Sequence, residues 1–93
     1  MNNNYKELEN KAEILKALAH PVRLCIVRGL MEKENCNVNF MQECLDMPQS
    51  TISQHLQKLR SVGIIEGERH GLEVIYKIKN KEIAEMVKIL LDI

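Results

Sequence analysis

Hydrophobic residues recur along this chain with two different periods. As far as Gly63 the spacing is three to four residues, which is the period of an amphipathic helix. The expected helices cover residues 5–19, 21–31, 38–45 and 49–60. Pro21 suits the first turn of the second helix, where no backbone donor is needed, and Asn37 is a suitable N-cap for the third. The first two thirds of the chain therefore predict consecutive helices with short connections.

After Gly63 the spacing of hydrophobic residues changes to two. That period predicts strands over residues 64–69 and 72–78, which reverse direction at His70-Gly71. Asn80 then caps a last helix that runs through the remaining residues. The predicted fold is mainly α, in the order α-α-α-α-β-β-α.

The segment 49–60 carries the most specific signal. Its hydrophobic residues Ile52, Leu56 and Leu59 share one side, and the helix contains no acidic residue. An outer face of hydroxyls, amides and cations suits the base edges and phosphates of DNA. The residues of this helix expected to contact DNA are Gln49, Ser50, Thr51, Ser53, Gln54, His55, Gln57 and Lys58.

The expected contacts of this helix divide into two kinds. Bases are expected to be reached by Ser50, Ser53 and Gln54. Phosphates are expected to be held by Gln49, Thr51 and Lys58. His55 borders the hydrophobic side, so half-buried packing and a contact with the DNA backbone both remain open for it.

The order of the elements predicts how this helix meets DNA. A short helix, a brief turn and a polar-faced second helix form a helix-turn-helix, which places the second helix in the major groove. The hairpin beside it is then a wing, with Arg69 and His70 near phosphates. A plain solvated loop tip is the alternative for these two residues.

The first and last helices carry more hydrophobic surface than one small core can cover. We therefore expect them to form a two-fold dimer interface, which sets two recognition helices about one DNA turn apart. The residues expected in this interface are Leu8, Ala12, Leu15, Ile83, Met86, Val87, Leu90 and Leu91.

The net charge is zero, because 13 basic residues balance 13 acidic ones. Such a balance is unusual for a nucleic-acid binder, but the position of charge matters more than its sum. The 93 residues, 45% of them hydrophobic, predict one domain spanning 1–93. No signal peptide, membrane-spanning run, nucleophile–base pair or Gly-rich phosphate loop is visible in the sequence. We expect a cytoplasmic protein that is not an enzyme, needs no cofactor and binds no membrane.

Three stretches of the sequence together indicate a family. They are ALAHPVRL at 17–24, QSTISQHL at 49–56 and GLEVIY at 71–76. In this order and spacing they resemble the ArsR/SmtB family of winged-helix repressors over nearly the whole chain. The resemblance implies a homodimer that occupies a double-stranded DNA operator, an inverted repeat, and leaves it when an inducer binds. The recognition segment and the wing are most similar to PagR-type members, which are not metal sensors of the usual kind.

The inducer site departs from the pattern of the family. Arsenic and cadmium sensors carry a Cys-x-Cys pair at the start of the third helix, and the matching positions here are Asn37 and Asn39, whose neutral amides are poor ligands for soft metals. Zinc sensors carry Asp and His ligands on the last helix. The acidic residues of that helix here are Glu82, Glu85 and Asp92, and no histidine accompanies them. We therefore expect no metal site, and the inducer stays open.

The three cysteines leave two alternative functions open. Their odd number and irregular spacing do not suggest a disulfide framework. Cys44 is expected to be a small core residue and Cys36 to lie in a polar loop, whereas Cys25 shares a helix face with Arg28, which favours a reactive thiolate. A repressor that responds to thiol chemistry at Cys25, Cys36 or Cys44 is one alternative. A winged helix that binds proteins instead of DNA is the other.

Overall fold

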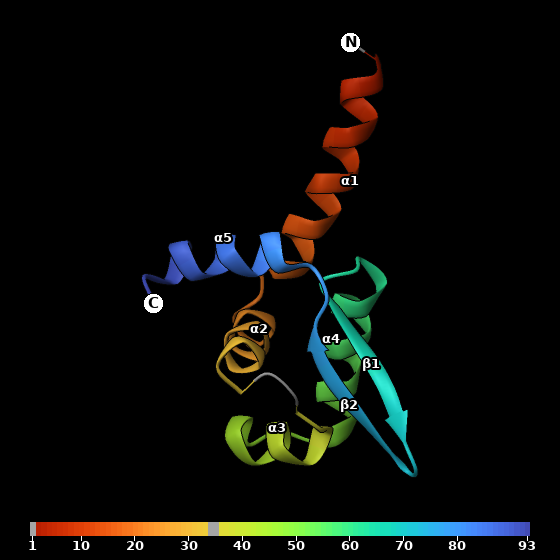
Figure 1. Ribbon diagram of the computed structural model, residues 1–93, viewed down its shortest axis with the longest axis vertical. Coiled ribbons are helices and arrows are strands. Elements are labelled where there is room, and N and C mark those ends of the chain that lie inside the picture. The colour runs from red at the N-terminus through yellow and green to blue at the C-terminus, as the bar shows by residue number, and fades with distance from the viewer. Residues whose placement is uncertain (1, 34–35) are drawn as a thin grey trace.

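The computed structural model describes residues 2–33 and 36–93, and for Asn2 and Asn3 it describes the backbone only. The element order is the predicted one (Figure 1). The helices are α1 (Asn2–Leu18), α2 (Pro21–Lys33), α3 (Val38–Leu45), α4 (Gln49–Ser61) and α5 (Lys81–Leu91), and the strands are β1 (Ile65–His70) and β2 (Glu73–Ile78). Both α1 and α2 are longer than their hydrophobic patterns predict, because polar residues extend α1 at its start and α2 at its end.

The helix α1 stands out from the rest of the molecule (Figure 1). Only its last turn, with Ala17 and Leu18, is buried in the body of the protein. Its hydrophobic residues Tyr5, Leu8 and Leu15 are exposed. The principal extents of 46 × 29 × 20 Å reflect this projecting arm.

The core is built around the hydrophobic side of α4. Ile52, Leu56 and Leu59 are completely buried, as their spacing predicts. They pack in one cluster with residues from α2 and from the start of the hairpin, among them Val27 and Ile64. Because the inner side of α4 is completely packed into the core, the outer side of the helix has a fixed orientation.

Asparagine caps begin both α3 and α5. Asn37 Oδ1 accepts a hydrogen bond of 2.8 Å from Phe40 N, and Asn80 Oδ1 accepts one of 3.1 Å from Ile83 N. Such caps satisfy amide groups that the first turn of a helix leaves unpaired. Both predicted caps are therefore confirmed.

The hairpin is antiparallel and pairs Ile65 with Ile78 at one end and His70 with Glu73 at the other. Its two-residue loop begins with Gly71, whose φ of 67° suits the glycine position of a type II′ turn. The reversal lies one residue later than the sequence pattern predicts. Leu72, the second loop residue, is fully exposed at the tip.

The structure corrects the surroundings predicted for two cysteines. Cys36 is buried, because its backbone pairs with Tyr76 through hydrogen bonds of 3.1 and 2.7 Å and so extends the hairpin by one isolated bridge. Cys44 is exposed instead of buried, because Met41 and Leu45 supply the inward positions of α3. Both differences arise from contacts between elements, which helical spacing does not report.

Candidate nucleic-acid interface

The outer face of α4 presents the predicted polar side chains to solvent. Gln49, Ser50, Ser53, Gln54 and Gln57 are all exposed. The flanking pair Thr51 and Lys58 is partly buried. None of the acidic side chains belongs to this helix, so its face offers hydrogen-bond donors and acceptors without repelling phosphates.

The N-terminus of α4 differs from those of α3 and α5. Its N-cap residue is Pro48, which makes no side-chain capping bond, and its first turn contains no acid. The first amide groups of the helix are therefore free of a side-chain acceptor. An uncapped helix N-terminus is suited to a DNA phosphate, because its N–H groups and the helix dipole both attract negative charge.

His55 is held in place by two residues, Arg23 of α2 and His20, which directly precedes α2. Its ring centroid lies 4.5 Å from that of His20, and its Nδ1 lies 3.4 Å from Arg23 Nη1. Burial lowers the pKa of His55 below its ordinary value of 6.5, and the neighbouring His20 and Arg23 lower it further. The structure thus provides the packing role that the sequence left open for this residue.

Arg23 is a residue that the sequence reasoning missed. Its Nε donates a hydrogen bond of 2.6 Å to Ala17 O at the end of α1, while its guanidinium also faces His55 of α4. It therefore joins the projecting helix to the recognition helix. The sequence does carry a signal for this residue, since Arg23 is the one cation in the hydrophobic stretch that begins α2.

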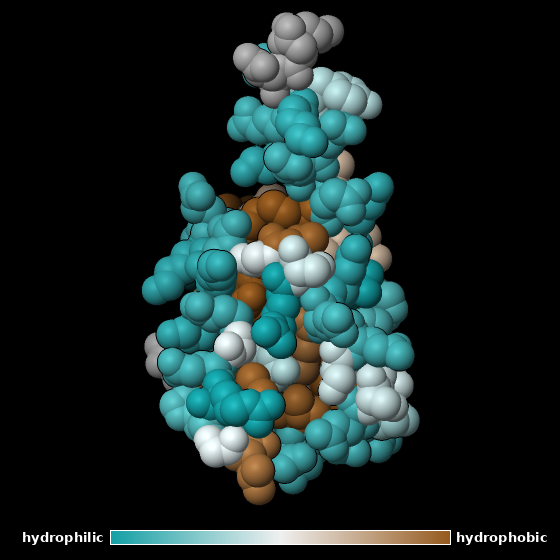
Figure 2. All heavy atoms as spheres, turned by 90° about the vertical axis from the view of Figure 1, so that its right-hand side faces the viewer, coloured by the Kyte–Doolittle hydropathy of each residue, from teal (hydrophilic) through white to brown (hydrophobic). Residues whose placement is uncertain are grey.

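The wing lies beside α4, and the face of the molecule that carries them is hydrophilic along its margins, with a hydrophobic band down its middle (Figure 2). Arg69 and His70 are both exposed near the hairpin loop. Arg69 Nη1 donates to Gly71 O at 3.4 Å, and His70 Nε2 lies 2.9 Å from Glu68 Oε1. These contacts are exposed, so both side chains stay accessible to a partner.

The wing is tied to the start of α3 through two neighbouring residues. Cys36 pairs with Tyr76 through the backbone, and Asn37 Nδ2 donates a hydrogen bond of 3.0 Å to Glu73 Oε2. Asn37 thus caps α3 with one side-chain atom and holds β2 with the other. The helix-turn-helix and the wing are consequently fixed to each other.

Most of the predicted interface residues on α1 and α5 are exposed. Leu8 is 62% exposed and Leu90 is 69% exposed, and Ala12, Leu15 and Met86 are also on the surface. Ile83 and Leu91 are partly buried against the core. Val87 differs from the others because it is completely buried within this chain, where it anchors α5. Ile89 and Ile93, which were not among the predicted interface residues, add to the exposed hydrophobic surface.

Comparison with known proteins identifies the family. A helix-turn-helix domain family matches residues 18–68. The transcriptional repressor PagR of Bacillus anthracis is 43% identical over 86 residues, which are 92% of this chain and 86% of PagR. Its crystal structure aligns with a TM-score of 0.83 over 92% of this chain and 98% of that one. This chain belongs to the ArsR/SmtB family of winged-helix transcriptional repressors.

Two further relatives agree with this assignment. The repressor SmtB of Mycobacterium tuberculosis is 41% identical over 80 residues, which are 86% of this chain and 58% of SmtB. The solution structure of a homodimeric winged helix-turn-helix DNA-binding domain from Mycobacterium bovis, a possible ArsR-family regulator, has a TM-score of 0.87 at 27% identity. It aligns over 98% of this chain and 83% of that domain. This member of the ArsR/SmtB family is thus a DNA-binding regulator. The family is one of transcriptional regulators and not of enzymes.

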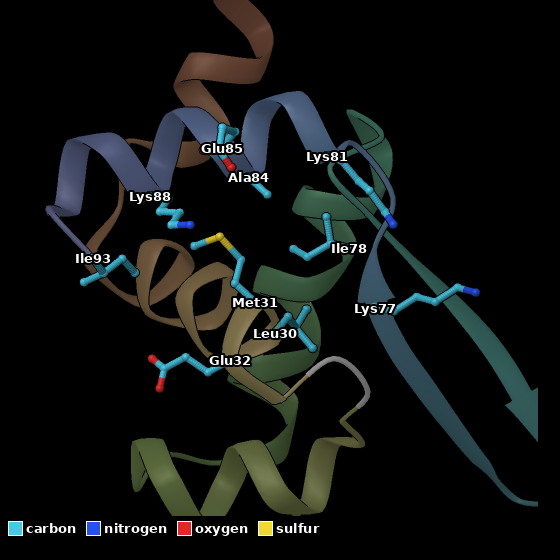
Figure 3. Close-up of a pocket in the computed structure, with 10 residues that line it drawn as sticks. All are labelled: Leu30, Met31, Glu32, Lys77, Ile78, Lys81, Ala84, Glu85, Lys88 and Ile93. Atoms are coloured by element: carbon cyan, nitrogen blue, oxygen red, sulfur yellow. The ribbon is translucent and has the colours of Figure 1, made fainter.

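A hollow of about 670 Å³ lies between α2, β2 and α5 in this ArsR/SmtB-family chain (Figure 3). Met31 projects into it from α2, and the amine of Lys88 points toward Met31, whereas those of Lys77 and Lys81 point away. The acidic lining residues are Glu32 and Glu85. In residues 2–33 and 36–93, no group of three or more His, Cys, Asp or Glu side chains is placed to hold a metal ion.

Within the same described ranges, no helix is both long enough and hydrophobic enough to cross a membrane.

Proposed function

We propose that residues 1–93 form one domain that acts as a homodimeric repressor in the cytoplasm, without enzymatic activity, and binds an inverted-repeat operator. The observation that carries this proposal is the exposed, acid-free face of α4 next to an accessible wing. A polar helix of this kind fits the major groove, where base edges offer distinct patterns of donors and acceptors. A wing beside it reaches the neighbouring backbone.

Base contacts are assigned to Ser50, Ser53 and Gln54, because they are exposed on one side of α4. An amide such as that of Gln54 can bond an adenine edge with two hydrogen bonds. Phosphate contacts are assigned to residues that flank this row or lie on the wing. They are Gln49, Thr51, Gln57, Lys58, Arg69 and His70.

The dimer is supported by the projecting α1 and the exposed hydrophobic residues of α5. Isolated hydrophobic surface residues are common, but several exposed on each of two helices favour an interaction site. The homodimeric relative from Mycobacterium bovis, which aligns with this fold, favours a second copy as the partner. Two-fold symmetry would then present two α4 helices to the two halves of an inverted repeat.

The test is operator binding by a variant that carries Ser53→Ala and Gln54→Ala. The operator is first obtained by selecting bound sequences from random DNA. Loss of a good base contact costs about 1–3 kcal/mol, and two copies of each change act in a dimer, so specific binding should be abolished in a gel-shift titration. Sedimentation should show that the dimer is intact.

A matched control is Ser61→Ala in the same helix. Ser61 Oγ donates a hydrogen bond of 2.7 Å to Lys58 O, so its hydroxyl group bonds within the last turn of α4 and is not expected to contact DNA. This variant should bind the operator as the unchanged protein does. Full binding by the double variant would refute the assignment of α4 as the reading element.

A further inference from the structure

All three cysteines line one cavity between α2 and α3. Cys25 comes from α2, Cys44 from α3, and Cys36 from the segment before α3. The cavity measures about 240 Å³. The rest of its wall is mainly hydrophobic and includes Ile26, Leu30, Phe40, Met41 and Leu45.

The three thiols have different surroundings. Cys36 is buried, and burial raises the pKa of its thiol, so it stays protonated and unreactive. Cys44 is exposed and forms no disulfide within the described part of the chain. Cys25 is partly exposed, and Arg28 Nη2 donates to its Sγ at 3.8 Å. Cys25 is therefore the thiol that combines access with a cationic neighbour.

The shape and lining of the cavity define the class of ligand. A hydrophobic cavity of about 150 Å³ already accepts a benzene ring, so this one has room for a substituted ring. In the described ranges, no three His, Cys, Asp or Glu side chains are close enough together to bind a metal ion. This favours an organic ligand for the cavity. Arg28 can also bond a carbonyl oxygen that gains negative charge.

We infer that this cavity is a modification site at which small hydrophobic quinones add to Cys25. The thiolate sulfur forms a bond to a ring carbon, and the electron pair of the C=C bond moves to the quinone oxygen beside Arg28. That ring carbon then loses its proton, and both quinone oxygens end as hydroxyls of a hydroquinone thioether. Thiol and quinone together supply every atom and electron of the product, so no further oxidant is needed.

The cavity is connected to both elements that would meet DNA, so this inference rests on the proposed function. One wall is α3, which leads into α4 through the turn at residues 46–48. Cys36, also in the wall, pairs with Tyr76 of the wing. A ring with substituents that fills the cavity displaces α3 from α2 and so disturbs the fixed arrangement of α4 and wing. DNA affinity therefore falls when Cys25 is modified.

The first experiment maps the order of modification. Methyl-p-benzoquinone and iodoacetamide are each added to the reduced full chain, and labelled peptides are followed by mass spectrometry over time. The quinone should label Cys25 before Cys44, whereas iodoacetamide should label the more exposed Cys44 first. The same order for both reagents would overturn the assignment of the cavity.

A cavity-filling variant gives an independent control. A Cβ at Gly29, which lines the cavity, meets no atom within 4 Å, so the side chain of Gly29→Leu begins in open space at the cavity wall. This variant should lose the fast reaction of Cys25 with the quinone and keep the iodoacetamide rate of Cys44. Unchanged quinone labelling of Cys25 would contradict the proposal.

The second experiment measures DNA binding before and after the quinone. The treated protein should lose about tenfold or more in affinity for the selected operator, and treated Cys25→Ser should keep its affinity. If the untreated protein binds no DNA, the proposed function fails, while the labelling order still tests the cavity. If the Cys25 adduct forms and affinity is unchanged, the link from cavity to α4 is wrong.

Discussion

Two glycines of this small protein lie in opposite environments, and the same substitution should affect them in opposite directions. A Cβ at Gly29 in α2 meets nothing within 4 Å, whereas one at Gly67 in β1 would lie 2.9 Å from Val74 Cγ1 and 3.0 Å from Tyr76 Cε1. Gly29→Ala should raise the free energy of unfolding by about 0.5–1 kcal/mol, because alanine loses less backbone entropy in a helix. Gly67→Ala should lower it by about 1–3 kcal/mol through overpacking.

Urea unfolding followed by circular dichroism measures both glycine changes. The slope of the free energy of unfolding against urea concentration should be the same in the variants and the unchanged protein, so that a shift of the midpoint reports a change in stability. A stabilised Gly67→Ala would show that the hairpin can relax around an added methyl group. A destabilised Gly29→Ala would show that α2 needs the glycine.

His55 should make the stability of the protein depend on pH. Its pKa is lowered in the folded protein by burial and by His20 and Arg23. As pH falls through 6.5, the ordinary value, the unfolded chain takes up the proton first, so stability falls until the lower folded pKa is reached. Above pH 6.5 both states are neutral at this residue, and it adds no pH dependence.

Thermal unfolding across this pH range should separate His55 from other groups. His55→Gln keeps a polar side chain but cannot titrate, so its melting temperature should fall less on acidification than that of the unchanged protein. Parallel losses in the two proteins would assign the pH dependence to other residues.

At the scale of single elements, the two asparagine caps provide a matched pair. Asn80 caps α5, whereas Asn37 caps α3 and also holds Glu73 of the wing. Each change to alanine should cost about 1 kcal/mol of stability through the lost cap. Asn37→Ala should in addition loosen β2, because its bond to Glu73 is lost.

Hydrogen exchange distinguishes the two cap variants. Faster exchange in the wing is expected for Asn37→Ala alone, since low local stability appears as local opening. Equal wing protection in both variants would show that the backbone bridge between Cys36 and Tyr76 is sufficient to hold the hairpin.

At the scale of the whole molecule, the exposed hydrophobic residues of α1 and α5 should determine the oligomeric state. Leu8→Glu and Leu90→Glu each place an acid in the proposed interface, and two-fold symmetry introduces it twice. Uncompensated charges there cost several kcal/mol, so the dimer should dissociate about 100-fold more readily. Sedimentation at several protein concentrations measures this change.

Leu72→Glu is the control for the interface variants. Leu72 is 101% exposed at the wing tip, far along the hairpin from α5. This variant should leave the mass in solution unchanged. Dissociation by all three variants would point to a general effect of added charge instead of a specific interface.

Local interactions explain how much of the fold and site could be predicted from the sequence. The inner side of α4, with Ile52, Leu56 and Leu59, follows from helical spacing, and the caps at Asn37 and Asn80 depend on bonds within one turn. Such features involve residues close in sequence, so their pattern is visible there. The element order and the exposed polar face of α4 follow from the same periodicity.

The packing of elements decided the remainder. Burial of Cys36 against Tyr76, exposure of Cys44 and complete burial of Val87 each depend on how helices and strands are oriented in space. Residues distant in the sequence meet there, and a helical or strand period says nothing of which face meets which partner. The sequence by itself therefore determined the elements and the reading face. Only the tertiary structure brought three cysteines around one cavity and joined His55 to Arg23.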